Sequence, residues 1–293
     1  MLRTLVRPLE SERSLAIVGV LGLVLSAACA IVMWIRGSSF IPPEADLTKA
    51  ITFNGAVGIY VLTLALYAPL ASFTPRGRTR WRGWTIGLTL YGYSIETIQA
   101  FRGLDPRFSR FGTLADGVLG GLFFLSAVGL IVTFIILATK LFSGPAREKA
   151  PLLLLGMQYG SATTMLAFAA GLWMSAVQGR LTGESGNILP LHALGFHGLQ
   201  AVPLIALMLE RSQLTYGLAR RWVHVAGIAW LGATTAVAVQ TAMGRSVTEM
   251  STLPVLGELL LLVWLVAAGK SLWSWRRGRA LEQFPAGQGS IVR

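Results

Sequence analysis

The sequence predicts an all-α membrane protein, a polytopic bundle of about eight transmembrane helices with both termini in the cytoplasm. Only 13% of the residues are charged, 54% are hydrophobic, and the mean hydropathy is +0.62. Soluble domains carry roughly 25% charged residues. Long apolar runs recur along the chain, and most of the basic residues lie between them.

A helix needs about 20 mostly apolar residues to cross a bilayer. The loops are too short for a soluble domain, so residues 1–293 are expected to form a single transmembrane domain. The tail at 276–293 is polar, contains Gly and Pro, and is expected to be disordered. No strand is expected, no internal repeat is apparent, and an inverted repeat of four plus four helices stays open. The expected spans are residues 15–35, 51–73, 84–101, 117–142, 151–177, 189–210, 222–243 and 254–275.

The distribution of Lys and Arg predicts the orientation in the membrane. With the N-terminus in the cytoplasm, 18 of the 25 Lys and Arg residues fall in cytoplasmic segments, as the positive-inside rule requires. These segments are expected to contact anionic lipid head groups. Their placement between apolar runs argues against nucleic acid as the partner of the net charge of +12. The one cysteine, Cys29, excludes a disulfide within the chain.

Two of the three histidines, His192 and His197, lie in the segment 189–210, and Gln200 follows them. Polar groups are costly in hydrocarbon unless they have partners, so this side of the helix is expected to face protein or water. At about 100° per residue, the histidines diverge by about 140°, too far to chelate one metal ion as an i, i+4 pair does. Gly195 and Gly198 lie opposite and suit close packing against another helix or a second copy of the chain.

A second polar face lies on the segment 84–101, where Tyr93, Glu96, Gln99 and Arg102 are spaced by three and share one side. Glu96 and Arg102 are nearly two turns apart, so each is expected to pair with another element. A carboxylate inside the membrane is expensive and by default marks a functional site. Glu96, Gln99 and Arg102 are therefore candidates for a ligand or proton site. The alternative is that Glu96 bonds a neighbouring helix and locks the bundle.

Most other intramembrane polar residues fall in the outer half under this topology, which predicts a polar cavity open to, or near, the outer face. The most specific expectation is that Glu96 lies next to His197. The charged residues of the loop that follows residue 101, including Arg107 and Arg110, are expected mainly at a solvated surface. The secondary site candidates are Tyr93, Asn54, Asp105, Asp116, Gln240 and Glu258.

Three functions remain open for these residues. The first is a carrier or binder of a small polar or acidic solute, with Glu96, His197 and Gln200 as ligand or proton sites and Arg102 as an anion contact. The second is an intramembrane enzyme or redox protein that uses haem, a metal ion or a quinone-like lipid. Its candidate metal ligands are His197, His192 and Glu96. The third is a structural or assembly subunit of a membrane complex.

A resemblance to uncharacterised multi-spanning bacterial membrane proteins is carried by two segments, ESGNILPLHALGFHGLQAVPL and YGYSIETIQAFRGLDPRFSR. In the first segment an acidic loop leads into a helix with the pattern H-x4-H-x2-Q. The two segments together cover about 40 residues. The resemblance implies a bacterial inner membrane as the location and implies no activity.

Overall fold

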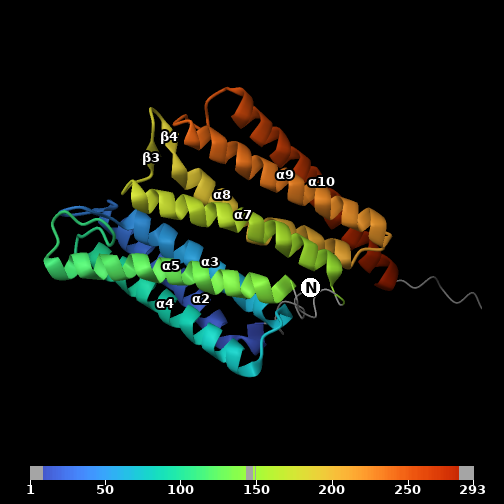
Figure 1. Ribbon diagram of the computed structural model, residues 1–293, viewed down its shortest axis with the longest axis horizontal. Helices are drawn as coiled ribbons and strands as arrows, with labels where there is room; N and C mark the ends of the chain where they lie inside the picture. The colour runs from blue at the N-terminus through green and yellow to red at the C-terminus, as the bar shows by residue number, and fades with distance from the viewer. Residues whose placement is uncertain (1–8, 143–147, 149, 284–293) are drawn as a thin grey trace, which may run out of the picture. The chain divides into compact units, whose positions relative to one another are not determined.

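The structure is a computed structural model that describes residues 9–142, 148 and 150–283. It is all-α apart from two short hairpins (Figure 1). The chain divides into two compact units, Met1–Pro145 and Ala146–Arg293, which we call unit 1 and unit 2.

The described part of unit 1 consists of long helices joined by one hairpin and short turns. Asp46 caps the helix after the hairpin by accepting the backbone N–H of Thr48 at 2.9 Å. Thr74 caps the next helix by accepting the N–H of Gly77 at 3.1 Å, with Pro75 in the first turn, where a missing N–H is tolerated. In chain order the elements are α2 (Arg13–Arg36), β1 (Phe40–Ile41), β2 (Ala45–Asp46), α3 (Leu47–Tyr67), η1 (Ala68–Leu70), α4 (Pro75–Phe101) and α5 (Leu114–Phe142).

Unit 2 has the same kinds of elements in the same order. Asn187 caps the helix after the second hairpin by accepting the N–H of Leu189 at 3.0 Å. The elements are α7 (Pro151–Ala176), β3 (Leu181–Thr182), β4 (Gly186–Asn187), α8 (Ile188–Glu210), α9 (Tyr216–Ala242) and α10 (Thr252–Gln283).

Glycines allow the first two helices of each unit to approach closely. A Cβ on Gly58 of α3 would lie 2.8 Å from the carbonyl oxygen of Gly19 in α2. A Cβ on Gly160 of α7 would lie 2.8 Å from the carbonyl oxygen of Gly198 in α8. Small residues at such crossings are typical of membrane helices. The predicted strip of Gly195 and Gly198 is confirmed as a packing surface, and its partner is α7.

Seven helices in the described residues are long and apolar enough to cross a membrane. These are all the long helices except α4, whose first turns carry Arg76, Arg78, Arg80 and Arg82. The length and composition of these helices are those of a multi-pass membrane protein.

From the hairpin through the second helix after it, unit 2 repeats unit 1 at a constant distance along the sequence. α3 begins at Leu47 and α8 at Ile188, while α4 begins at Pro75 and α9 at Tyr216, in both cases 141 positions later. The elements recur in the same order, and each unit contributes an even number of long helices. This recurrence identifies an internal repeat, which the sequence leaves open only in an inverted form.

The contact between the hairpin and the end of α4 in unit 1 has the same hydrogen bonds as the contact between the hairpin and the end of α9 in unit 2. In unit 1 the carbonyl oxygen of Gly103 accepts the N–H groups of residues 44 and 45, at 3.0 and 3.1 Å. In unit 2 the carbonyl oxygen of Gly244, again 141 positions later, accepts those of residues 185 and 186, at 3.0 and 2.9 Å. Each glycine thus ties the end of α4 or α9 to the hairpin of its own unit.

Glycine is required at both of these positions. The φ angles are +81° at Gly103 and +71° at Gly244, in the left-handed region that side chains disfavour. A Cβ on Gly103 would lie 1.8 Å from the carbonyl oxygen of Pro42, and one on Gly244 would lie 2.6 Å from the Cα of Gly183. No side chain fits between the loop and the hairpin in either unit.

The structure changes several details of the sequence-based prediction. α4 begins at Pro75 and α9 at Tyr216, earlier than the expected residues 84 and 222. Their arginine-containing first turns are helical although they are not apolar. α10 continues through residue 283, and the rest of the expected tail, residues 284–293, lies outside the described residues. The hairpins correct the expectation of no strands, because two-residue strands are too short to produce a visible alternation.

The repeat is visible in the structure although none is apparent by inspection of the sequence. It escapes inspection because few residues coincide at equivalent positions. Among those that do are Thr74 and Thr215, which precede α4 and α9, and Gln99 and Gln240, which lie near the ends of these helices.

Candidate functional site

Charged and polar side chains gather at one end of unit 1, where α3 and α5 begin and α4 finishes. We call this the hairpin end. The loop of residues 102–113 folds back so that its side chains reach the helices. The unit 1 polar cluster comprises Lys49, Glu96, Gln99, Arg102, Asp105, Arg107 and Asp116.

Glu96 is the most buried member of the cluster, with 0% of its surface exposed. Its Oε2 accepts a hydrogen bond from Arg107 Nη2 at 2.6 Å. The Arg107 guanidinium also lies 5.5 Å from the ring centroid of Phe53 and 5.3 Å from that of Phe123, and these aromatic faces stabilise its charge. The pair confirms that Glu96 has its partner outside its own helix. It corrects the expectation that Arg107 is mainly solvated.

Asp105 also belongs to the cluster rather than to a solvated surface, with only 14% of its side chain exposed. Its Oδ2 accepts from Lys49 Nζ at 2.6 Å. Its Oδ1 accepts the backbone N–H groups of Arg107 and Phe108 at 2.9 and 3.1 Å. Burial raises the pKa of this carboxyl, but the hydrogen bonds from Lys49 and from the two amides outweigh burial, so the pKa lies below its ordinary value. Asp105 therefore fixes the fold of the loop as a charged carboxylate and joins the loop to Lys49 of α3.

Asp116 closes a second network in which both carboxylate oxygens have donors. Oδ1 accepts from Gln99 Nε2 at 2.9 Å and from Arg102 Nη1 at 2.5 Å. Oδ2 accepts from the backbone N–H and the hydroxyl of Thr113, both at 2.8 Å. Arg102 thus pairs with another element, as expected. It would have to leave Asp116 before it could contact an anionic solute.

Three buried oxygen atoms around the Glu96 turn of α4 form no hydrogen bond with the described residues. They are Glu96 Oε1, Asn54 Oδ1 and Tyr93 Oη. Asn54 Nδ2 donates to Thr97 Oγ1 at 3.0 Å, which holds the Asn54 amide beside this turn. A buried polar group without a partner costs about 1–3 kcal/mol. Such an arrangement suits a site that takes up a proton, a cation or a polar ligand.

The candidates from the segment 189–210 lie on α8 in unit 2. His192 is half-buried, and its Nδ1 lies 2.8 Å from the carbonyl oxygen of Ala167 in α7. Its ring meets that of Phe196 edge to face at 4.8 Å. His197 is exposed, and Gln200 is half-buried. The two histidines therefore lie in different environments, in agreement with their predicted divergence.

The remaining candidates of unit 2 do not join the α8 histidines in one cluster. Gln240 is buried and donates from Nε2 to the carbonyl oxygen of Ser246 at 3.0 Å, whereas Glu258 is exposed. Within the described residues of either unit, no three His, Cys, Asp or Glu side chains are placed so that they could hold a metal ion. Glu96 belongs to unit 1 and His197 to unit 2, so their predicted contact stays a prediction.

The sequence reasoning did not single out Lys49 or Glu12, and the structure places both in ion pairs. Lys49 enters the polar cluster from the first turn of α3. Glu12 is fully buried at the opposite end of unit 1 and pairs with both Arg78 and Arg82, the latter at 3.3 Å. The i, i+4 spacing of the two arginines indicates a shared partner, but it does not indicate which carboxylate.

Comparison with models of known protein families, with curated proteins and with solved structures gave no match. The interpretation of the polar cluster therefore depends on its own geometry and charge.

Proposed function

We propose that this protein is a transporter of a bacterial inner membrane that moves a small polar or acidic solute with proton coupling. The unit 1 polar cluster is its binding site, and Glu96 is the proton acceptor. One observation carries the proposal. Glu96 is fully buried, Arg107 holds one of its oxygens at 2.6 Å, and the other oxygen has no donor among the described residues. Buried carboxylates in membrane helices mark proton relays and ion pathways.

The Glu96–Arg107 pair supplies a route from proton uptake to solute binding. A proton on Glu96 neutralises the carboxylate and leaves the Arg107 guanidinium without its counter-charge. An anionic group of a solute can then take the place of the carboxylate as the partner of Arg107. Because Arg107 belongs to the 102–113 loop, the same step loosens the loop from α4.

The internal repeat supports transport over the other functions, because many secondary transporters are built from internal repeats. The two units are not chemically equivalent. Val237 of unit 2 stands at the position of Glu96, 141 residues later, so this acceptor occurs in one unit only. His192, His197 and Gln200 of α8 are the candidate ligand groups that unit 2 adds.

The test uses the proton as the probe, because it needs no knowledge of the solute. The purified full-length protein is reconstituted into liposomes that enclose a pH-sensitive dye, and a membrane potential is imposed. We expect proton entry faster than into empty liposomes, with the excess lost in Glu96→Gln. Glu184→Gln, a change of the same kind at an exposed residue of the second hairpin, is the matched control and should keep the wild-type rate.

An equal rate in wild type and Glu96→Gln would contradict the proposal, as would a wild-type rate no higher than that of empty liposomes. Both results would favour a second candidate, a structural or assembly subunit. The hydrogen bonds of Asp116 with Gln99, Arg102 and Thr113 support a structural role, because they occupy both carboxylate oxygens. In that case Glu96→Gln lowers thermal stability and leaves proton entry unchanged.

A further inference from the structure

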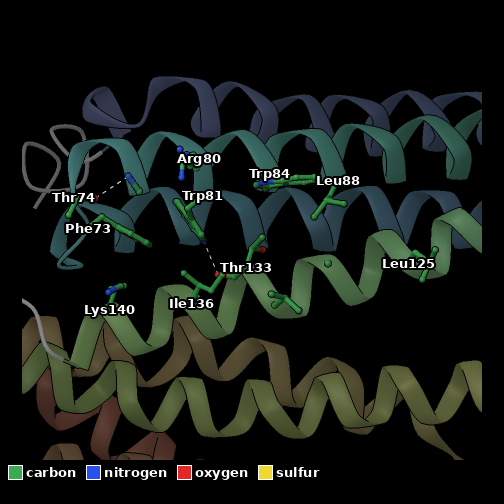
Figure 2. A pocket seen from close by; sticks show the side chains of 13 residues that line it. Phe73, Thr74, Arg80, Trp81, Trp84, Leu88, Leu125, Thr133, Ile136 and Lys140 are labelled. Carbon is green, nitrogen blue, oxygen red and sulfur yellow. Dashed lines mark hydrogen bonds between the residues drawn. The ribbon is translucent and has the colours of Figure 1, made fainter.

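A groove runs between α4 and α5 at the end of unit 1 that lies away from the hairpin (Figure 2). It has a volume of about 710 Å³, which is in the range of ligand pockets, roughly 300–1,000 Å³. It starts near Thr74, the residue that caps α4, and near Lys140 in the last turn of α5. It continues along both helices as far as Leu88 and Leu125. The polar cluster contributes no residue to it.

The walls of the groove are apolar over most of its length. Trp81 joins the two helices, because its Nε1 donates to the carbonyl oxygen of Thr133 at 2.8 Å. Trp84, Leu125 and Val132 line the groove and are exposed. Leu88 of α4 packs directly against Gly129 of α5, where a Cβ would lie 2.8 Å from the leucine side chain. The space suits a hydrocarbon chain laid along the helices.

Two cations line this apolar groove, Arg80 on α4 and Lys140 in the last turn of α5 (Figure 2). The neighbouring Arg78 and Arg82 share Glu12 as their ion-pair partner. By contrast, neither Arg80 nor Lys140 forms an ion pair with a carboxylate among the residues that the structure describes. An adjoining hollow of about 350 Å³ shares Arg80 and leaves room for a head group.

We propose that this groove binds one anionic phospholipid, with an acyl chain between α4 and α5 and the phosphate at Arg80 and Lys140. The positive-inside topology predicts this end of the unit at the cytoplasmic face, where anionic lipids attract basic side chains. Tryptophans such as Trp81 and Trp84 favour the same interfacial depth. A second copy of this chain fits less well, because its own cytoplasmic segments are basic and its net charge is +12.

The test is native mass spectrometry of the full-length protein equilibrated with an equimolar mixture of phosphatidylglycerol and phosphatidylcholine of identical acyl chains. We expect one retained phosphatidylglycerol and a clear preference over phosphatidylcholine. In Arg80→Gln combined with Lys140→Gln, the preference should fall about 25-fold, since each basic residue near the surface contributes about fivefold. Val132→Trp should lower the retention of both lipids, because it fills the groove without changing its charge.

Arg221→Gln is the matched control, because Arg221 is exposed and stands at the position equivalent to Arg80 in unit 2. It should keep the wild-type preference. The proposal is overturned if the wild type retains both lipids equally, if the double variant keeps its preference, or if Val132→Trp retains phosphatidylglycerol as before. Displacement of the lipid by inorganic phosphate alone would assign the cations to a soluble anion and would also overturn it.

Discussion

At the residue scale, Gly103 shows how one position holds a loop against a helix bundle. Gly103→Ala places a Cβ 1.8 Å from a backbone oxygen at a φ of +81°. We expect it to lower the free energy of unfolding by more than about 2 kcal/mol, measured by denaturant unfolding in detergent. Gly87→Ala is the control, because a Cβ there meets nothing within 4 Å and α4 should gain up to about 1 kcal/mol. Equal stability of the two variants would refute this role of Gly103.

Glu44 and Asp105 make the hairpin of unit 1 sensitive to acid. Glu44 Oε1 accepts the N–H of Asp105 at 3.1 Å, and its Oε2 accepts that of Arg110 at 3.0 Å. Burial raises the pKa of Glu44, but the hydrogen bonds from Ser109 and from these amides lower it below its ordinary value. The pKa of Asp105 is also lowered. Carboxyls with lowered pKa values stabilise the fold above their unfolded-state pKa values, about 4, and lose this contribution as the pH falls through the folded-state values.

The second hairpin provides an internal comparison. Ser185 and Ser246 stand at the positions of Glu44 and Asp105, and they preserve the contact without an ionisable group, because Ser185 Oγ accepts the N–H of Ser246 at 3.1 Å. Hydrogen exchange, corrected for intrinsic rates, should therefore accelerate below about pH 4 in peptides covering residues 40–46 and 102–110. Residues 181–187 should change far less. Equal acceleration in both hairpins would show that the two carboxyls are not the cause.

At the element scale, the helix caps after the two hairpins can be compared, because they occupy equivalent positions. The comparison tests whether equivalent caps contribute equally to the free energy of unfolding. Asp46 caps α3 by accepting the backbone N–H of Thr48 at 2.9 Å. Asn187 caps α8 in the same way, by accepting the N–H of Leu189 at 3.0 Å. Asp46→Ala and Asn187→Ala should each lower the free energy of unfolding by about 1 kcal/mol, measured by denaturant unfolding. A loss in one variant alone would mean that the two junctions, despite their shared geometry, do not contribute alike.

The same elements show what the sequence could predict. Long apolar runs indicate helices because only a helix satisfies its backbone groups in hydrocarbon, and each described long helix overlaps a predicted segment. The first turns of α4 and α9 could not be predicted from apolar runs, because arginines lower the hydropathy of a segment without breaking the helix. The hairpins could not be predicted from apolar runs either. Their geometry depends on Gly103 and Gly244, which contact them from positions distant in the sequence.

The candidate site was predictable only in part. The spacing of Glu96, Gln99 and Arg102 correctly indicated one face and partners on other elements. The identity of those partners was not predictable, because Arg107 and Asp116 reach the face through the fold of the 102–113 loop. Charged loop residues are ordinarily solvated, and no local pattern distinguishes those that fold back.

At the scale of the whole molecule, the topology expected from the sequence, in which all eight predicted segments cross the membrane, predicts that equivalent positions of the two units lie on the same side of the membrane. In a Cys29→Ser background, single cysteines at Arg76 and at Gly217 should react with an impermeant thiol reagent only from the cytoplasmic face. Cysteines at Ser38 and at Gly179 should react only from the outside. All of these positions are exposed. If equivalent positions react from opposite faces, either α4 does not cross the membrane or the number of crossings per unit is odd.

The central claim is that Glu96 takes up and releases a proton within the membrane. Infrared difference spectroscopy of the purified full-length protein, titrated from mildly alkaline to acidic pH, tests it most directly. We expect a carbonyl band of a protonated buried carboxylic acid that grows as the pH falls and is missing in Glu96→Gln. The same band should remain in Glu184→Gln. Identical difference spectra of the wild type and Glu96→Gln across the titration would contradict the claim and leave Glu96 as a fixed ion-pair partner of Arg107.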